Sequence, residues 1–383
     1  MKLLHLSDLH IGKRVHGFCM LDDQRVVLEQ VKDYISIHKP QALILAGDIY
    51  DRSNPAAEAI ALFSEFVATV LNEYKTPILA VAGNHDGAEL IGYGNQIFDK
   101  LNFYIEGVFK PDVRKVQLCD EHGTVNFYLL PFADHQVVRD VLKDPDIKNL
   151  DEAAQAIMRN ISSELDAQAR NVLITHGYLT GGMDPELCDS EKPLSIGGKG
   201  NVRVAHFEVF DYVALGHLHQ AQKIGSDKVR YAGSLLPYSF SEEQHKKTVT
   251  LVDIDASGEV QVRLLPLRIP HSMYTLRGSL SELLDNVRPE LRQAYLQIIL
   301  TDENELVEPK RQLDKCYDNI MLFSIQNRLT MIQNIQLDNA KRKHKAPLDM
   351  FEDFYRSCTQ EDMSEVEREF MAASIEQLKG GGL

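Results

Sequence analysis

Short apolar runs alternate with helical periodicity along the first ninety residues. Three runs of four or five residues are largely apolar and too short for typical helices, so they predict buried strands at 3–6, 42–46 and 78–82. Between these runs, apolar side chains recur three to four residues apart at 27–35 and at 60–70, which predicts two amphipathic helices. This alternation indicates an α/β domain whose strands are buried on both faces.

The same alternation continues through the middle of the chain. Further apolar runs predict strands at 127–130, 172–175, 212–215 and 248–253. Residues 139–169 are expected to be helical, because apolar side chains recur every four residues there. We therefore expect one domain over residues 1–270.

A second unit begins after Pro270. A helix is expected around 280–287 and a strand at 294–300, which places a smaller α/β domain over residues 271–340. Before this unit, the Gly- and Pro-containing stretch 181–200 predicts a long loop. Loops of that length are more often functional than idle.

The end of the chain, residues 341–383, has a different character. A basic cluster at 341–345 precedes two short amphipathic helix candidates, capped by Asp349 and Ser364, each with a Glu three residues later. Two helices cannot bury an aromatic stripe alone, so we expect this pair to pack on the protein itself or on a partner. The basic cluster fits a solvated linker and a phosphate-backbone contact equally well.

The composition is that of an ordinary globular protein, with 44% hydrophobic and 25% charged residues among 383. There are 41 Lys and Arg against 56 Asp and Glu, and the net charge of −15 argues against nucleic acid and anionic membrane as partners. Much of the acidic excess lies in residues 139–192 and 346–383, so it is a poor guide to the substrate. Without metal and partner, we expect weak DNA binding.

Cysteine usage and the N-terminal sequence point to the cytoplasm. The five cysteines are scattered and form no C-x-x-C pair, which disfavours both a thiolate zinc site and a secreted disulfide framework. The first apolar stretch is interrupted at Asp8, too early for a signal peptide, and no apolar run approaches the roughly 20 residues of a membrane span. We expect a soluble, cytoplasmic protein without a membrane partner.

The most informative feature is the position of the Asp, Asn and His side chains. Five predicted strands are each followed by a block of such residues: Asp8-Leu9-His10, Gly47-Asp48-Ile49-Tyr50-Asp51, Gly83-Asn84-His85-Asp86, Thr175-His176-Gly177 and Gly216-His217-Leu218-His219. Open α/β sheets place their sites at the carboxyl ends of strands, and glycine permits the tight turns that aim side chains at one point. The five blocks therefore predict a single site.

The residue types indicate a metal site. Carboxylate, amide oxygen and imidazole without thiolate favour Mn, Fe or Zn. The candidate ligands are too many for one ion and fit two ions that share a carboxylate, an arrangement that binds a phosphate ester and activates water. A single His after a strand is more often structural, so the hypothesis depends on the five blocks together.

The order D-x-H, G-D-x-x-D, G-N-H-D, H and G-H-x-H resembles the calcineurin-like metallophosphoesterase superfamily. Further stretches are similar to the SbcD nuclease family: the acidic run 189–198, the segment 211–219, and 231–234 continued by 238–242. The tail from 347 to 378 resembles the helix pair with which that family grips its ATPase partner, SbcC. The resemblance implies a sandwich of two mixed β-sheets flanked by helices, a smaller α/β capping domain and a C-terminal helix pair.

The resemblance also implies the site residues. It places Asp8, His10, Asp48 and His219 on one divalent ion, and Asp48, Asn84, His176 and His217 on a second, with Mn²⁺ as the implied metal. His85 would protonate the leaving oxygen or neutralise the transition state, a task that suits a group titrating near neutral pH. Asp51 would orient His85 or raise its pKa, and a helix cap is an equally good reading of Asp51.

The implied function is that of a DNA nuclease. The family acts as an exonuclease on double-stranded ends and an endonuclease on hairpins and single strands, as a homodimer with SbcC, in DNA repair, recombination and replication. Such a protein would be cytoplasmic and associated with the nucleoid. A phosphatase or phosphodiesterase acting on small molecules or phosphoproteins would use the same site, but has no evident use for the aromatic tail. A purely structural subunit would not need every ligand position to be filled.

Overall fold

The computed structural model describes residues 1–181, 185–191 and 201–326, together with a few isolated residues nearer the C-terminus. The chain divides into two compact units, Met1–Tyr274 and Thr275–Leu383. The basic cluster at 341–345 and nearly all of the predicted C-terminal helix pair lie outside the described residues, as do residues 192–198 of the acidic run.

The first unit contains a six-stranded mixed sheet. In spatial order its strands are β16 (Val260–Pro266), β15 (Thr248–Ile254), β1 (Lys2–Leu6), β4 (Ala42–Ala46), β5 (Ile78–Val81) and β6 (Phe103–Glu106). The last four strands are parallel, whereas β15 runs antiparallel to both β1 and β16. The parallel strands are buried on both faces, as their nearly continuous apolar runs predict.

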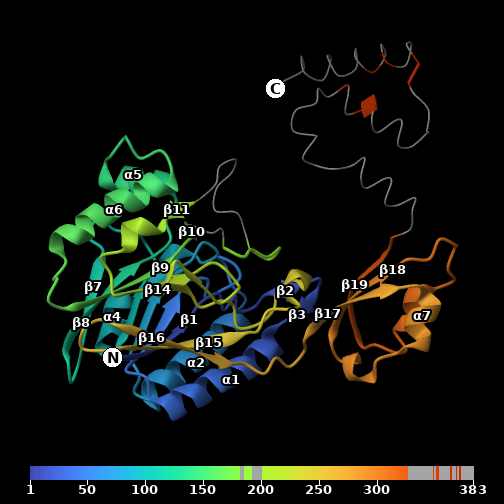
Figure 1. The fold of residues 1–383 in the computed structure, drawn as a ribbon, viewed down its shortest axis with the longest axis horizontal. Coiled ribbons are helices and arrows are strands. Elements are labelled where there is room, and N and C mark those ends of the chain that lie inside the picture. Colours follow the sequence, from blue (N-terminus) through green and yellow to red (C-terminus); the bar gives the residue numbers. More distant parts are fainter. Residues whose placement is uncertain are drawn as a thin grey trace. The chain divides into compact units, whose positions relative to one another are not determined.

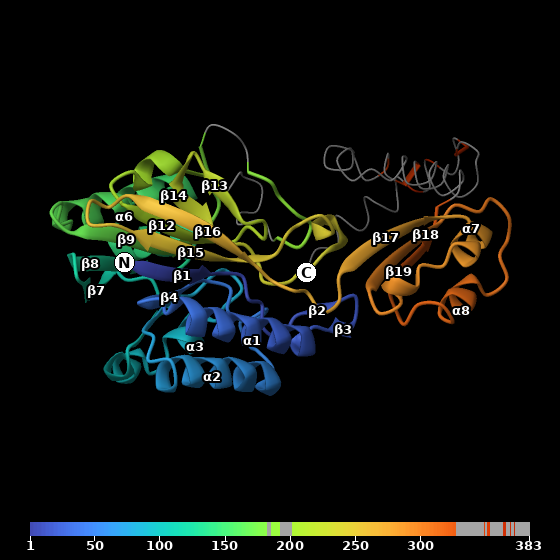
Figure 2. The ribbon, with the colours of Figure 1, turned by 60° about the horizontal axis from the view of Figure 1, so that its bottom comes forward.

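A second six-stranded sheet lies beside the first (Figure 2). Its strands, in spatial order, are β13 (Gln222–Ile224), β14 (Ser226–Tyr231), β12 (Tyr212–Gly216), β9 (Arg170–His176), β8 (Gly123–Leu130) and β7 (Arg114–Asp120). The four central strands are parallel and the two edge strands are antiparallel to their neighbours. Both sheets therefore mix parallel and antiparallel strands, but the antiparallel pairs lie on one side of the first sheet and at both edges of the second.

Helices cover the outer faces of the two sheets (Figures 1 and 2). One apolar cluster joins the sheets, with Ile44 and Leu79 from the first against Phe127 and Ile174 from the second. A second cluster packs α5 (His135–Leu142) and α6 (Leu150–Glu164) on the second sheet, and α1 (Leu21–His38) and α2 (Ala57–Asn72) lie along the first. This arrangement confirms the predicted sandwich of two mixed sheets flanked by helices.

The prediction of one helical segment over 139–169 was wrong in detail. Two helices occupy the region, because α5 ends where Lys143 takes a left-handed conformation and Pro145 follows shortly after. Asn149 then caps α6 by accepting a hydrogen bond from the backbone of Glu152. Among the helices of the described residues, none combines the length and apolar character needed to cross a membrane.

The second unit contains a three-stranded sheet in the order β17 (Met273–Gly278), β18 (Tyr295–Leu300) and β19 (Asn319–Ile325). The short helices α7 (Leu280–Asp285) and α8 (Pro309–Leu313) connect these strands, and Ser279 and Glu282 form a capping box at the start of α7. The expected helix and strand of this region correspond to α7 and β18. The strands β17 and β19 were not predicted.

One polar pair lies inside the apolar core between the sheets. His5 on β1 and Tyr212 on β12 are fully buried, and their Nδ1 and Oη atoms are 2.9 Å apart. Burial, and secondarily the positive charge of Arg230, lowers the pKa of His5 to about 3. His5 is therefore neutral in the folded protein well below the pH at which an exposed imidazole takes up a proton.

We expect this pair to make stability depend on pH. Between pH 6.5 and 3 the unfolded chain binds a proton at His5 that the folded chain does not, so the free energy of unfolding falls as pH drops, by up to about 1.4 kcal/mol per unit. Urea unfolding at pH 7, 6 and 5 measures this slope. The double variant His5→Phe/Tyr212→Phe should have a shallower slope, and equal slopes would contradict the assignment.

Candidate metal centre

The carboxyl ends of neighbouring parallel strands bring the predicted ligands together. Asp8 and His10 follow β1, Asp48 follows β4, Asn84 and His85 follow β5, His176 ends β9, and His217 and His219 follow β12. β1, β4 and β5 are adjacent in the first sheet, and β9 and β12 are adjacent in the second. The loops that carry the five sequence blocks therefore meet at one edge of the sandwich.

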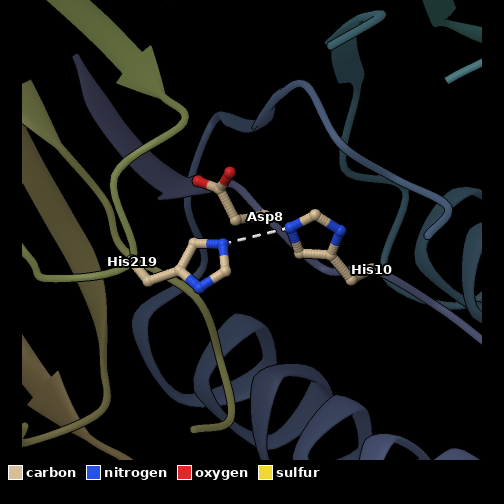
Figure 3. Close-up of side chains that lie close together, drawn as sticks. All are labelled: Asp8, His10 and His219. Carbon is tan, nitrogen blue, oxygen red and sulfur yellow. Dashed lines mark hydrogen bonds between the residues drawn. The ribbon is translucent and has the colours of Figure 1, made fainter. Parts of the chain in front are cut away.

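One group of ligands consists of Asp8, His10 and His219, whose candidate ligand atoms all lie within 4.8 Å of one another. The Nε2 atoms of the two histidines are 3.1 Å apart. Figure 3 shows a ring nitrogen of each histidine pointing toward the other ring, with Asp8 beside them. These side chains approach one point from β1 and β12, on different sheets.

A second group adjoins the first. Asp8, Asp48 and His176 also place ligand atoms within 4.8 Å of one another. Asn84 Oδ1 lies 2.9 Å from Nε2 of His176 and 3.3 Å from Nδ1 of His217. The structure thus brings all seven predicted ligands together.

Asp48 lies between the two groups. Its Oδ2 atom is 3.7 Å from Nε2 of His10 and 3.5 Å from Nε2 of His176. A carboxylate in this position can contact ions in both groups. The assignment of Asp48 as the bridge, and the division of the other ligands between two ions, remain predictions.

Burial shifts the titration of these ligands strongly. Burial raises the pKa of Asp8 to about 6, despite the opposing effect of His176, and burial followed by the charge of Asp86 raises the pKa of Asp48 well above its usual range. Burial and then neighbouring histidines lower the pKa of His10 and of His217 well below normal. Burial therefore makes the carboxylates harder to ionise, and the imidazoles harder to protonate, than the same groups in water.

This donor set fits divalent cations. A cation favours ionised carboxylates and binds neutral imidazoles, so it would resolve the electrostatic conflict that burial creates. The convergence of the two Nε2 atoms has the same explanation, since both can donate a lone pair to one ion. Carboxylate, amide and imidazole donors without a thiolate favour Mn, Fe or Zn.

The ligand loops adopt uncommon backbone conformations that other buried groups hold in place. Asp8, His10 and Asp48 have φ angles of 52°, 44° and 50°, in the left-handed region that side chains disfavour. Gln24 donates a hydrogen bond to the carbonyl oxygen of His10 at 2.7 Å, and Tyr238 donates one to that of Leu9 at 2.6 Å. These contacts stabilise the loop that carries the first two ligands.

Asp86 joins the loops of the second and third blocks. Its carboxylate accepts hydrogen bonds from the backbone N–H groups of Ile49, Tyr50 and Gly83 at 2.9 to 3.1 Å. Asp86, the last residue of the G-N-H-D block, therefore fixes the two loops to each other. It lies beside the predicted ligands and is not one of them.

His85 lies at the edge of the ligand cluster. Its Nε2 atom is 3.9 Å from Oδ2 of Asp48, and its Nδ1 atom is 2.9 Å from the backbone carbonyl oxygen of Asp51. The Asp51 carboxylate accepts a hydrogen bond from Lys13 at 2.7 Å and lies 3.7 Å from Nδ1 of His10. Asp51 therefore contacts His85 through its main chain and the site through its side chain.

The alternative reading of Asp51 as a helix cap does not hold. The helix that follows, α2, has Ala56 at its N-cap and no side-chain capping bond.

The sequence did not reveal the groups that support the ligands. Five polar side chains contact a ligand or its loop: Gln24, Ser190, Tyr238, Glu242 and Lys247. Three of these residues lie in stretches that resemble the SbcD family, but no spacing pattern indicates that they touch the site. These residues lie far along the chain from the ligands that they contact, so no local pattern shows the contact.

Two family models match the chain. A family model described as calcineurin-like phosphoesterase matches residues 1–221, and one described as type 5 capsule protein repressor C-terminal domain, an SbcD C-terminal model, matches residues 269–359. The fold and site define a metal-dependent phosphoesterase of the calcineurin-like class. Within that class, the chain belongs to the SbcD nuclease subunit family.

A curated relative spans nearly the whole chain. The SbcD subunit of the SbcCD nuclease from Staphylococcus epidermidis is 31% identical over 368 residues, which is 96% of each protein. Among solved structures, a phosphopantetheinyl hydrolase from Mycobacterium tuberculosis is 17% identical with a TM-score of 0.38, covering 69% of this chain and 95% of its own. A dimetal phosphatase from Danio rerio is 12% identical with a TM-score of 0.39, covering 70% and 98%.

Two glycines beside the ligands differ in how much space a side chain would have. A Cβ on Gly216 would lie 1.9 Å from the carbonyl oxygen of Ala46 and 2.7 Å from Nδ1 of His176. These two atoms are hydrogen-bonded to each other at 2.9 Å, which orients the His176 ring. A Cβ on Gly177 would meet no described atom within 4 Å.

We therefore expect Gly216→Ala to destabilise the fold by about 2 kcal/mol or more and to reduce bound metal, because the two sheets must separate locally. Gly177→Ala is the matched control and should change stability by less than about 1 kcal/mol. Thermal unfolding and elemental analysis after dialysis against Mn²⁺ measure both effects. Similar behaviour of the two variants would rule out the close packing described.

Proposed function

We propose that the protein is a metal-dependent DNA nuclease that acts as the nuclease subunit of a complex with an SbcC-type ATPase. The observation that carries the proposal is the convergence of all seven ligand side chains in a chain that is 31% identical, over 96% of its length, to the SbcD subunit of an SbcCD nuclease. The proposed activities are exonuclease on double-stranded ends and endonuclease on hairpins and single strands. It would act in DNA repair, recombination and replication. Its location would be the cytoplasm, in association with the nucleoid.

The proposed site holds two divalent ions, most suitably Mn²⁺. One would be bound by Asp8, His10, Asp48 and His219, and the other by Asp48, Asn84, His176 and His217. When bound, such ions polarise a phosphodiester and lower the pKa of water. The position of Asp48 between the two groups supports its role as the shared ligand.

His85 is the proposed proton donor. Its Nδ1–H donates to the carbonyl oxygen of Asp51, which fixes the ring and directs Nε2 toward the ligand cluster. When the ring is protonated, Nε2–H can give its proton to the leaving oxygen of the cleaved ester. Asp51 would contribute by positioning His85 through its main chain and by its charge near His10.

The proposed division of labour follows the domains expected from the sequence. Residues 1–270 would form the nuclease domain, residues 271–340 a capping domain, and residues 341–383 a basic linker and the helix pair that binds the ATPase. The match of an SbcD C-terminal family model to residues 269–359 supports this assignment.

A phosphoesterase acting on small molecules or phosphoproteins is the alternative that the site geometry alone would allow. The full-length similarity to a nuclease subunit favours DNA. A panel that compares linear DNA, hairpin DNA and a small nucleotide ester under the same Mn²⁺ concentration separates the two. Turnover of the small ester without DNA cleavage would favour the alternative.

We expect His85→Ala to lower Mn²⁺-dependent degradation of linear DNA by about 100-fold or more, because a proton donor to the leaving group is lost. Metal content should remain that of the wild type, since His85 is not a proposed ligand. His122→Ala, at an exposed position in the turn before β8, is the control. Full activity of the His85 variant would remove the role given to this residue.

A homodimer is also part of the proposal, and the structure offers an apolar surface for it. A groove of about 570 Å³ lies between α2 and the segment from α3 (Ala88–Gly92) to β6. Its apolar lining includes Ile60, Leu90, Tyr93 and Leu101, which are 42% to 78% exposed. Exposed apolar surface of this kind marks interaction sites. We propose that the same surface of a second copy of the chain packs against it, in a two-fold symmetric contact.

We expect Tyr93→Glu/Leu101→Glu to weaken self-association by about 100-fold or more, because a two-fold interface would bury like charges against each other. Sedimentation velocity over a concentration series measures the effect. Val307→Glu, at a position that is 79% exposed in the second unit, serves as the control. Unchanged association of the double variant would place the dimer surface elsewhere.

A further inference from the structure

Behind His219, a chain of polar side chains runs away from the ligand cluster. Nδ1 of His219 is 2.7 Å from Oγ of Ser190, and that hydroxyl donates to Oε1 of Glu242 at 2.6 Å. The other carboxylate oxygen of Glu242 accepts a hydrogen bond from Nζ of Lys247, also at 2.6 Å. The four residues come from the 185–191 loop, the β12 loop and the segment before β15.

The direction of these hydrogen bonds determines the tautomer of His219. Ser190 has a single hydroxyl proton, and the bond to Glu242 uses it, so Oγ must accept the bond from His219. A neutral His219 therefore carries its proton on Nδ1 and leaves the lone pair on Nε2. That Nε2 atom faces Nε2 of His10 at 3.1 Å (Figure 3).

Glu242 is held as a carboxylate although it is buried. The ammonium group of Lys247, itself buried, lies against Oε2 and supplies the opposite charge that a buried carboxylate needs. The backbone N–H of Tyr238 also donates to Oε1 at 3.0 Å. The carboxylate at the end of the chain of hydrogen bonds is therefore matched by a cation and by hydrogen-bond donors.

The 185–191 loop holds His219 at a second point. Oε1 of Glu191 accepts the backbone N–H of His219 at 2.7 Å, and Oε2 accepts the backbone N–H of Cys188 at 3.1 Å. Cys188, His219 and Glu242 also have the spacing of a metal-binding trio. The thiol there is a hydrogen-bond donor to Glu191, and burial with nearby acidic groups raises its pKa, so hydrogen bonds account for the cluster.

We propose that Ser190 and Glu242 are positioning residues that set the tautomer and direction of His219, so that the 185–191 loop completes one of the two ion sites. This proposal rests on the proposed role of His219 as a ligand. It gives a function to residues 189–191, the described part of the acidic run. Outer hydrogen-bond partners of ligand histidines commonly change metal affinity by 10- to 100-fold.

The test measures Mn²⁺ binding to the full-length protein by calorimetry and uses Ser190→Ala. We expect one of two binding events to weaken by about 10- to 100-fold while the other is retained. Ser190→Thr keeps the hydroxyl and should restore the affinity. Ser241→Ala is the matched control, since its hydroxyl anchors the same loop through the backbone N–H of Asp189 without touching His219.

The possible results separate this proposal from the proposed function. A wild-type protein that binds no Mn²⁺ would overturn the metal site itself. Two wild-type binding events that Ser190→Ala leaves unchanged would overturn only the positioning role. Equal losses in Ser190→Ala and Ser241→Ala would also overturn it, because they would trace the effect to loop docking in general.

Discussion

Asp8 and Asp48 are buried next to each other, and their burial governs the electrostatics of the whole site. Both carboxylates are almost completely shielded from water, where ionised groups are stable only opposite positive charge or several donors. Protein donors meet part of this need: both oxygens of Asp8 lie 3.0 Å from the backbone nitrogen of His217, and Asp48 accepts the N–H of His85. The remaining lone pairs face imidazoles that resist protonation, which leaves a position suited to divalent cations.

The sandwich of two sheets is the architecture that makes this burial possible. No single strand is followed by more than two of the seven ligands, and the ligand groups draw on both sheets. The sheets must therefore approach closely at the edge where their strands end, which requires glycine at position 216 opposite the main chain of Ala46. Asp86 then ties the two loops of the first sheet together.

The elements with strong local patterns were predicted well, and those with weak or interrupted patterns were not. The parallel strands are continuous apolar runs, so their positions agree with the structure to within a few residues. The break between α5 and α6 was missed because a four-residue periodicity persists on both sides of Lys143. The edge strands β7 and β13 were missed because one face of each is exposed and their apolar pattern is weak.

Local patterns in the sequence were enough to name the candidate metal ligands. Five blocks of Asp, Asn and His after strand signals specify which side chains can bind metal, since ligand type and the position of strand ends are local properties. The groups that support these side chains became visible in the folded structure alone. Glu242 lies 23 residues from His219 and Ser190 lies 29 residues from it, and Asp51 turned out to contact His85 through its main chain. Such contacts arise from the packing of loops that are distant along the chain, which no local pattern encodes.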